Sequence, residues 1–359
     1  MGEFSKYISS KRRSVPTPKS IVDEKGQCVF GTFDKEFIDL DLLRAKKPTR
    51  APSFLNKTRF TAWEATEVNL KDCVVLTALC DMGLFGINLT LFYDKRTKKV
   101  HTFSTNLPSK KTYISPNLLE SNKTQATHKN GFILFENNFG EGKCSVKGNH
   151  KNKKGENIQY DFLLERVSLP CVVSIPFGKN RPLYSQKDFF AAQGKIIFNG
   201  EEFLSDENST AIIDDHKGYY PRRMHYDWVT TLSRDFNGEK KYFAFNLTRN
   251  QSINQEDYNE NLIWMQDKIS LLPPVTFQKN ILTKDFKGEA IWKIKDEHDM
   301  VNIEFKIEDI YRNEIHALII DTQYYVAFGT LSGFVRDEEG NKISVDGLTG
   351  IGEDKSMLF

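Results

Sequence analysis

Long apolar runs are missing from this chain, and so is an excess of charge of either sign. No apolar run approaches the length that is needed to cross a bilayer. Fifty lysine and arginine residues against 48 aspartate and glutamate residues leave a formal net charge of +2. This balance gives no electrostatic reason to expect a nucleic acid or a membrane surface as a partner. We therefore expect a globular protein with no nucleic-acid partner and no transmembrane segment.

Cysteine is also scarce, and its placement excludes two kinds of site. The number is odd and no CxxC pair occurs, so neither a zinc motif nor a redox motif is indicated. The basic residues 1–20 are not followed by an apolar segment, which predicts neither a secretory signal nor an anchor. We expect reduced thiols in a cytoplasmic protein of bacterial type. The cysteines are Cys28, Cys73, Cys80, Cys144 and Cys171.

Motifs for cofactor or nucleophile chemistry are absent from the sequence. The pair Gly350 and Gly352 stands near a β-type C-terminus with no helix after it, so it does not form a phosphate-binding loop. No GxSxG elbow occurs either. We expect no cofactor, and we expect neither a nucleotide-dependent enzyme nor a serine hydrolase.

Alternation of apolar and polar residues is what the sequence does contain. Residues 74–79 and 86–93 are rich in β-branched and aromatic side chains, and a charged turn separates the second run from residues 100–103. Short strands joined by tight turns are typical of antiparallel barrels or sandwiches. Asn-Gly pairs, which supply the positive φ of such turns, begin at Asn130, Asn199 and Asn237.

The length of 359 residues predicts about two domains. We expect residues 1–20 to form a flexible N-terminal segment. Residues 21–195 are then assigned to a first β-domain and residues 196–359 to a second. A β-protein can exchange strands across such a boundary, so the position of the boundary near residue 195 is approximate.

Acidic, basic, hydroxyl and aromatic side chains are densest in residues 211–229, AIIDDHKGYYPRRMHYDWV. An apolar triplet leads directly into Asp214, Asp215 and His216, at the end of what reads as a buried strand. Neighbouring side chains of a strand point to opposite faces, so these three do not all share one face. The stretch is the main candidate for a functional site.

The charges of this stretch have a structural interpretation as well as a functional one. Asp214 or Asp215 could hold Arg222 or Arg223 in a buried ion pair that fixes the following loop. Metal binding is disfavoured, because the oxygen and imidazole ligands have no spacing signature, and we expect no metal. The ligand types considered are those of Asp214, Asp215, His216 and His225.

The functional interpretation treats Asp214 as a carboxylic acid whose pKa is raised by an apolar cavity. Such an acid could protonate an alkene or a carbonyl, with His216, Tyr219 or Tyr220 as its hydrogen-bonding partner. Aromatic faces could stabilise the resulting cation. The candidate aromatic residues are Trp63, Tyr226 and Trp228.

Five landmarks in order along the chain resemble the bacterial family known as domain of unknown function 2804. The resemblance spans nearly the whole chain and implies two lipocalin-like antiparallel β-barrels packed together, with few short helices. That architecture is similar to the architecture of carotenoid 1,2-hydratases and certain fungal cyclases. In such folds hydrophobic small molecules occupy a pocket inside a barrel or between the two. The landmarks are residues 21–26, 59–63, 171–177, 211–228 and 328–354.

Two functions of different classes follow, and the sequence alone does not decide whether the protein is an enzyme. The first is the binding of a hydrophobic or amphipathic small molecule in a barrel or inter-barrel pocket. The second is a cofactor-independent hydratase, isomerase or cyclase that acts on an unsaturated substrate through Asp214, with His216 and Tyr219. Nothing in the sequence indicates an oligomeric state. The expected ligand-binding residues are Trp63, Tyr220, Arg222, Tyr226, Asp227, Trp228, Asn246 and Glu353.

Overall fold

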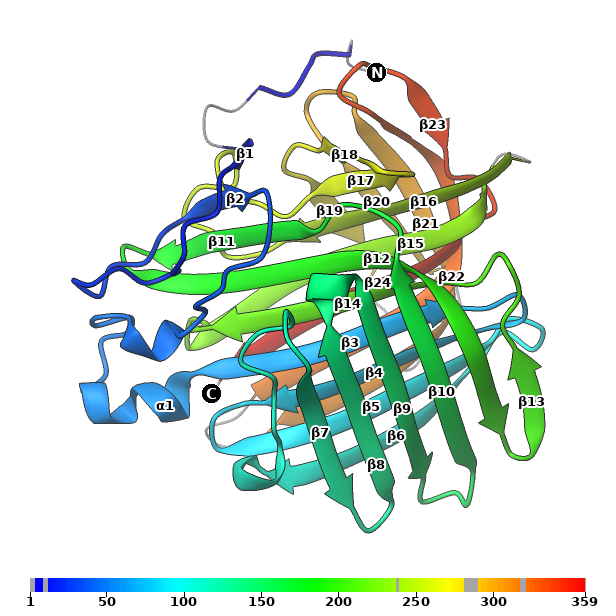
Figure 1. Cartoon of the computed structure of the whole chain (residues 1–359). Helices are drawn as coiled ribbons and strands as arrows, with labels where there is room; N and C mark the ends of the chain where they lie inside the picture. The colour runs from blue at the N-terminus through cyan, green and yellow to red at the C-terminus, as the bar shows by residue number, and fades with distance from the viewer. Residues whose placement is uncertain (1–3, 9–11, 237–238, 281–289, 317–320, 359) are drawn as a thin grey trace.

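The computed structural model describes residues 4–8, 12–236, 239–280, 290–316 and 321–358, and β-strands are the dominant secondary structure in them. Most strands lie in two large, strongly curled antiparallel sheets, so the predicted all-β class with a pair of barrels is confirmed (Figure 1). The turn predicted at Asn237 falls outside the described residues. The few helices among the described residues are short: α1 (Asn56–Arg59), η1 (Leu42–Arg44), η2 (Ser53–Leu55), η3 (Ser109–Lys111) and η4 (Phe139–Glu141).

The first sheet has 14 strands, and its main path runs β6-β5-β4-β3-β14-β12-β10-β9-β8-β7. The upright strands β7 to β10 and the flatter strands β3 to β6 form opposite walls of this barrel (Figure 1). Its strands are β1 (Ser14–Val15), β2 (Gly31–Phe33), β3 (Thr61–Asn69), β4 (Cys73–Asp81), β5 (Phe85–Asp94), β6 (Lys99–Pro108), β7 (Asn122–His128), β8 (Gly131–Asn138), β9 (Lys143–Lys151), β10 (Asn157–Arg166), β11 (Cys171–Gly178), β12 (Arg181–Phe198), β13 (Glu201–Leu204) and β14 (Thr210–Gly218).

Side chains join the two ends of this path where no strand ladder does so among the described residues. Asn88 on β5 lies 3.0 Å from His128 on β7 (Nδ2 to Nε2). Thr105 on β6 lies 2.8 Å from His150 on β9 (Oγ1 to Nε2). These polar side-chain contacts close the barrel together with an isolated backbone bridge between Tyr113, which follows β6, and Gln125 on β7.

The second sheet has 10 strands, with the main path β18-β17-β16-β15-β24-β22-β21-β20-β19. The last strand of the chain, β24, pairs with both β15 and β22, which places the C-terminal residues in the middle of the sheet. Its strands are β15 (Arg223–Phe236), β16 (Glu239–Arg249), β17 (Leu262–Met265), β18 (Lys268–Leu271), β19 (Thr276–Lys279), β20 (Ala290–Lys295), β21 (Val301–His316), β22 (Asp321–Arg336), β23 (Lys342–Ser344) and β24 (Thr349–Leu358).

The division between the sheets differs from the expected division near residue 195. β12 continues to Phe198, and β13 and β14 also belong to the first sheet. The reason is that β14 pairs with β3 on one side and with β12 on the other, joining the two walls of the first barrel. The change from one sheet to the other therefore falls between Gly218 and Arg223.

The N-terminal residues are more firmly packed than the expected flexible segment 1–20. Arg12 is 3% exposed, and its guanidinium donates hydrogen bonds to Thr32 Oγ1 and to the carbonyl of Asn261. Strand β1 pairs with β2. Within residues 12–20, Arg12 and β1 thus make specific contacts with the rest of the protein.

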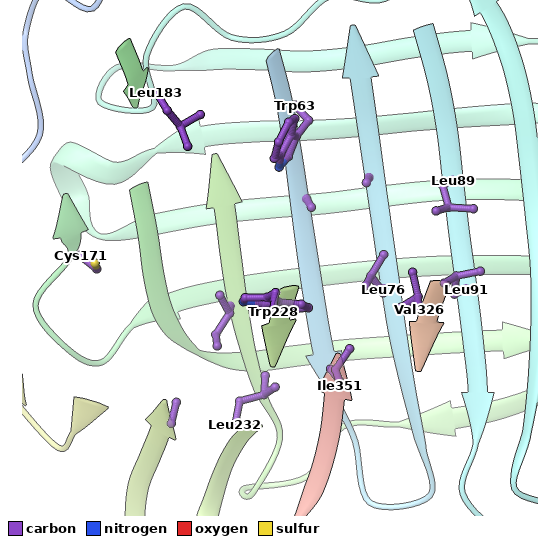
Figure 2. Packing of buried hydrophobic residues seen from close by; sticks show 14 of the residues in the cluster. Trp63, Leu76, Leu89, Leu91, Cys171, Leu183, Trp228, Leu232, Val326 and Ile351 are labelled. Atoms are coloured by element: carbon purple, nitrogen blue, oxygen red, sulfur yellow. The ribbon is translucent and has the colours of Figure 1, made fainter. Parts of the chain in front are cut away.

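Four apolar clusters occur among the described residues, and three of them form layers that follow from the alternation of side chains along the strands. One layer, with Phe135 and Phe162, fills the first barrel, and another, with Phe305, fills the second. The third layer lies between the sheets (Figure 2). There Trp63, Leu76 and Leu89 of the first sheet meet Trp228, Val326 and Ile351 of the second. Because this layer is shared, residues distant in sequence converge between the sheets.

Candidate functional site

A cavity of about 100 Å³ lies between the two sheets. Strands β3, β4, β5, β12 and β14 supply its lining from the first sheet, and β15, β16, β21, β22 and β24 supply it from the second. One part of the lining is apolar, with Ala65, Leu76, Ala78, Met82 and Leu89. The other part carries ionisable side chains and hydroxyl groups, so the cavity is amphipathic.

Strand alternation decides which charges of β14 reach this cavity. Asp214 and His216 line it, whereas Asp215 and Lys217 do not. The Lys217 ammonium instead pairs with the Asp215 carboxylate, and both side chains are almost fully buried. The prediction that neighbouring members of this stretch point to opposite faces is therefore confirmed.

A buried network of opposite charges surrounds Lys187 of β12. Its Nζ atom lies 2.6 Å from Glu260 Oε2 and 3.3 Å from Asp214 Oδ1. The Nε2 atom of His216 lies 3.0 Å from the same Asp214 oxygen. Ser185 donates a further hydrogen bond of 2.6 Å to Glu260 Oε2. These contacts let the charges remain buried, since each has a partner of opposite sign.

The ion-pair partners are not the arginines that we expected. Arg222 and Arg223 are exposed, while Asp214 pairs with Lys187 and His216. The cause is the strand register, which places Lys187 directly opposite Asp214 on the neighbouring strand. The predicted ion pair exists, but it is formed across the sheet rather than with the following loop.

The same cations reverse the expected titration of Asp214. Burial raises the pKa of this carboxyl, but nearby His216 and Lys187 outweigh burial, so the pKa lies below its ordinary value. Burial lowers the pKa of His216, and Asp214 outweighs it, so that pKa is raised. Of the two interpretations of Asp214, the lowered pKa agrees with the ion-paired carboxylate and not with the neutral acid, because the surroundings of this carboxyl are cationic rather than apolar.

Aromatic stacking holds the imidazole of His216 in place. The Trp63 ring stacks on it with centroids 4.6 Å apart and planes at 17°. Trp63 also stacks on Tyr220 at 5.4 Å, and the Tyr220 hydroxyl lies 3.2 Å from His216 Nδ1. Such contacts on both ring nitrogens and on one face limit the rotation of the imidazole.

A second polar group lies on β24 and the strands beside it. The hydroxyls of Tyr226 and Tyr324 donate hydrogen bonds of 2.8 Å and 2.5 Å to Glu353. The Lys355 ammonium lies 4.8 Å from the ring centroid of Tyr324, 5.7 Å from Tyr226 and 5.6 Å from Trp63. These distances are typical of cation–π contacts. Burial raises the pKa of Glu353 even though the two hydroxyls and Lys355 favour its charged form.

Glu67 of β3 is a third polar feature of the lining. It is 2% exposed, and its Oε2 atom has no hydrogen-bond partner among the described residues. Burial, followed by the carboxylates of Asp214 and Glu353, raises its pKa well above the ordinary value. The surroundings of Glu67 therefore favour the neutral form of its carboxyl, whereas those of Asp214 favour the charged form.

The structure brings together seven of the residues predicted from the sequence and leaves four outside the lining. Tyr219 packs against Phe60 with ring centroids 5.4 Å apart, and Arg222 is exposed. Asp227 faces away and pairs with Lys279, while Asn246 supports the lining by accepting a hydrogen bond of 2.7 Å from Trp228 Nε1. The lining residues are Trp63, Asp214, His216, Tyr220, Tyr226, Trp228 and Glu353.

Sequence reasoning missed several ionisable residues of the cavity. Lys187 and Glu260 lie far from residues 211–229 in sequence, and only strand pairing brings them close to Asp214. Two of the missed residues did have a local indication. Glu67 alternates with Trp63 and Ala65 on one strand, and Lys355 alternates with Glu353 on another.

One group of possible metal ligands occurs among the described residues, and it lies outside the cavity. Ligand atoms of His225, Asp227 and Asp354 all lie within 4.8 Å of one another. The Lys279 ammonium pairs with both carboxylates of this group. A lysine therefore already supplies the positive charge that a metal ion would bring.

Comparison with protein families decides what kind of protein this is. Residues 12–359 match the family described as a domain of unknown function, DUF2804. The chain belongs to this family. The resemblance inferred from the five landmarks is thereby confirmed. No curated protein matches the DUF2804 chain.

Solved structures similar to this DUF2804 protein have low sequence identity. Kievitone hydratase from Nectria haematococca has 12% identity and a TM-score of 0.48, with 82% of this chain and 88% of that chain covered. CghA with Sch210972 has 8% identity and a TM-score of 0.43, with coverages of 83% and 89%. Neither likeness carries an argument about ligand or activity. Across the described residues, no helix has both the length and the apolar character that crossing a membrane requires.

Proposed function

We propose that this DUF2804 protein binds a small amphipathic molecule in the cavity between its sheets. The observation that carries the proposal is the division of the lining into an apolar part and a part with buried ionisable groups. Ligand sites commonly combine apolar walls with a few placed polar groups that fix orientation. The apolar part of the molecule would contact Leu76, Ala78 and Leu89, and its polar end would lie toward Asp214 and Glu353.

A cavity-filling substitution tests this proposal. Ala78→Leu adds an apolar side chain to the lining, and we expect it to weaken the binding of the probe 2-octanone by about tenfold or more. Isothermal titration calorimetry measures the affinity. The control is Ala51→Leu, at a half-buried position outside the cavity, which should leave the affinity unchanged. Equal affinities for both variants, with both folded by circular dichroism, would contradict binding in this cavity.

A second candidate function is cofactor-independent acid–base catalysis on an unsaturated substrate. The observation that favours it is a set of carboxyl groups in one cavity whose pKa values are shifted in opposite directions. Burial raises the pKa of Glu67, where the neighbouring carboxylates act in the same direction, and of Glu353, where it outweighs Lys355 and two hydroxyls. At Asp214 and Glu260 the nearby Lys187 and His216 outweigh burial, so the pKa is lowered. Such divergence is how one site holds an acid and a base together. The acid would then be Glu67 or Glu353, with Asp214 charged and orienting His216.

Hydrogen exchange on carbon distinguishes the two functions. If the cavity catalyses proton transfer, the wild-type protein should incorporate deuterium from D₂O next to the carbonyl of 2-octanone, and Glu67→Gln or Glu353→Gln should abolish this incorporation. Binding of the ketone should persist in the catalytically inactive variant. If the wild-type protein binds the ketone tightly but does not catalyse deuterium incorporation into it, the result would support the binding function and contradict catalysis of proton transfer.

A further inference from the structure

The ionisable groups of the cavity balance one another without Glu67. Lys187 and His216 contact Asp214 and Glu260, and Lys355 adjoins Glu353 on the same strand. These three basic and three acidic side chains give a net charge of zero when all are ionised. Glu67 is the seventh ionisable group of this set, and no cation is left to pair with it among the described lining residues.

Ionisation of Glu67 would place a fourth carboxylate among these side chains, at a position that is almost fully buried. Its side chain is 2% exposed, and its electrostatic neighbours include the carboxylates of Asp214 and Glu353. The basic neighbour, Lys187, is already held by Glu260 at 2.6 Å. A buried carboxyl with two carboxylates nearby and no cation of its own retains its proton. It then becomes a hydrogen-bond donor.

A donor in this position requires an acceptor, and the protein does not supply one to Glu67 Oε2 within the described residues. Leaving a buried polar group without a partner is unfavourable. Glu67 is a residue of the cavity lining, so a molecule bound in the cavity lies beside its carboxyl group. The protein therefore has an unused, buried hydrogen-bonding group at the polar part of the cavity.

We propose that Glu67 is a neutral carboxylic acid that donates a hydrogen bond to the bound molecule, and that this molecule presents an uncharged oxygen acceptor, such as a carbonyl, ether or hydroxyl oxygen, at its buried end. This inference rests on the proposed binding function and adds the chemical class of the ligand. A carboxylate ligand would bring a further negative charge beside Asp214 and Glu353. An ammonium ligand would add a fourth cation to a site whose charges already balance.

A matched series of probes tests the chemical class. We expect 2-octanone to bind more tightly than octanoate and octylammonium, and more tightly than octane. Glu67→Leu should weaken 2-octanone binding by about fivefold to tenfold, the effect of one neutral hydrogen bond, without weakening octane binding. Glu67→Gln, which keeps a neutral donor, should retain the affinity within about twofold.

Glu64→Gln is the matched control for these variants. Glu64 lies on the same strand and is fully buried, but it does not line the cavity. Its replacement should leave the order of affinities unchanged. Tighter binding of octylammonium or octanoate than of 2-octanone would overturn the assigned ligand class. Failure of all four probes to bind would instead count against the proposed binding function.

Infrared spectroscopy tests the protonation of Glu67 without any ligand. In a Glu64→Gln background, which removes the other buried carboxyl on this strand, we expect a carbonyl stretch of a protonated carboxylic acid at neutral pH. The additional change Glu67→Gln should lower the intensity of that band, because it removes one protonated carboxyl group. Spectra that are identical with and without Glu67 would show that this carboxyl is ionised and would overturn the inference.

Discussion

Lys187 is the residue on which the charges of the cavity depend most. It is 1% exposed and pairs with both Asp214 and Glu260. The desolvation of these charges is offset only while all members of the network are present. A single substitution here thus removes the partner of two buried carboxylates.

We predict that Lys187→Met lowers the free energy of unfolding by about 3–5 kcal/mol, because two buried carboxylates lose their cation. The control is Lys195→Met on the same strand, where the ion pair with Glu202 at 2.6 Å is exposed. That change should cost less than about 1 kcal/mol. Urea denaturation of both variants provides the comparison, and equal losses would mean that the buried network adds nothing to stability.

The buried carboxyl of Glu64 should make the stability of the protein depend on pH with a sign opposite to that of an ordinary, ion-paired carboxylate. Burial and then Asp215 raise the pKa of its carboxyl from 4.5 to about 7. Between these values the folded protein holds a proton that the unfolded chain releases, so stability falls as pH rises through this window. We expect this group to cost about 3 kcal/mol above pH 7.

Glu64→Gln should remove that dependence. Relative to the wild-type protein, the variant should gain about 2.5 kcal/mol of unfolding free energy at about pH 8 compared with about pH 5. Denaturant unfolding at the two pH values measures the difference. A constant difference between variant and wild type across this range would show that Glu64 titrates normally.

At the residue scale, the sequence predicted the part of the site that is contiguous in the chain. Asp214 and His216 stand in one dense polar stretch after an apolar strand, so their location could be found from pattern alone. Their charge state could not, because it depends on Lys187 and Glu260, which strand pairing brings near. The sequence left the neutral and the ion-paired state of Asp214 both open because that contact is not visible in it.

At the element scale, the long strands of the second sheet require glycine where two backbones approach closely. Gly333 in β22 has φ +107°, and a Cβ atom there would collide with the carbonyl oxygen of Asn302 on β21. Only glycine adopts this conformation without strain beside a backbone atom that cannot move aside. The β21 and β22 pair therefore depends on this residue.

Gly333→Ala should destabilise the protein by about 3 kcal/mol through strain and the collision with Asn302. Gly347→Ala is the control, since its φ of +80° is also positive but a Cβ atom there meets nothing within 4 Å. Its cost should be about 1–2 kcal/mol, from backbone strain alone. Thermal unfolding of the two variants measures this difference in stability. Equal unfolding midpoints would contradict the predicted collision with Asn302.

The strands themselves were predictable because alternation and Asn-Gly turns are local properties. The turn pairs beginning at Asn130 and Asn199 do lie between strands of the structure, β7 and β8 for the first and β12 and β13 for the second. The membership of β14 in the first sheet was not predictable, since its partners β3 and β12 are set by long-range pairing. The change of sheet therefore comes after β14 rather than at the domain division that we expect near residue 195.

At the scale of the whole molecule, the layer between the sheets makes the two barrels interdependent. It includes Trp63 and Leu76 from one sheet and Trp228 and Ile351 from the other, all buried (Figure 2). Separation of the barrels would expose this apolar surface to water. We therefore treat the chain as one cooperative unit despite its two sheets.

Differential scanning calorimetry should show a single unfolding transition for the full chain, because neither sheet buries its share of this layer alone. The calorimetric and van't Hoff enthalpies should agree. Two resolved transitions would contradict this expectation and would show that the barrels are energetically separate domains.

Native mass spectrometry of the protein purified from its own host tests the central claim most directly. The account predicts one non-covalent small-molecule adduct per chain, released on denaturation, uncharged at its polar end and diminished in Ala78→Leu but not in Ala51→Leu. A ligand remains bound to the protein through purification when the ligand concentration exceeds the dissociation constant of the complex. An adduct of equal abundance in both variants, or no adduct together with no binding of 2-octanone, would contradict a ligand site between the two sheets.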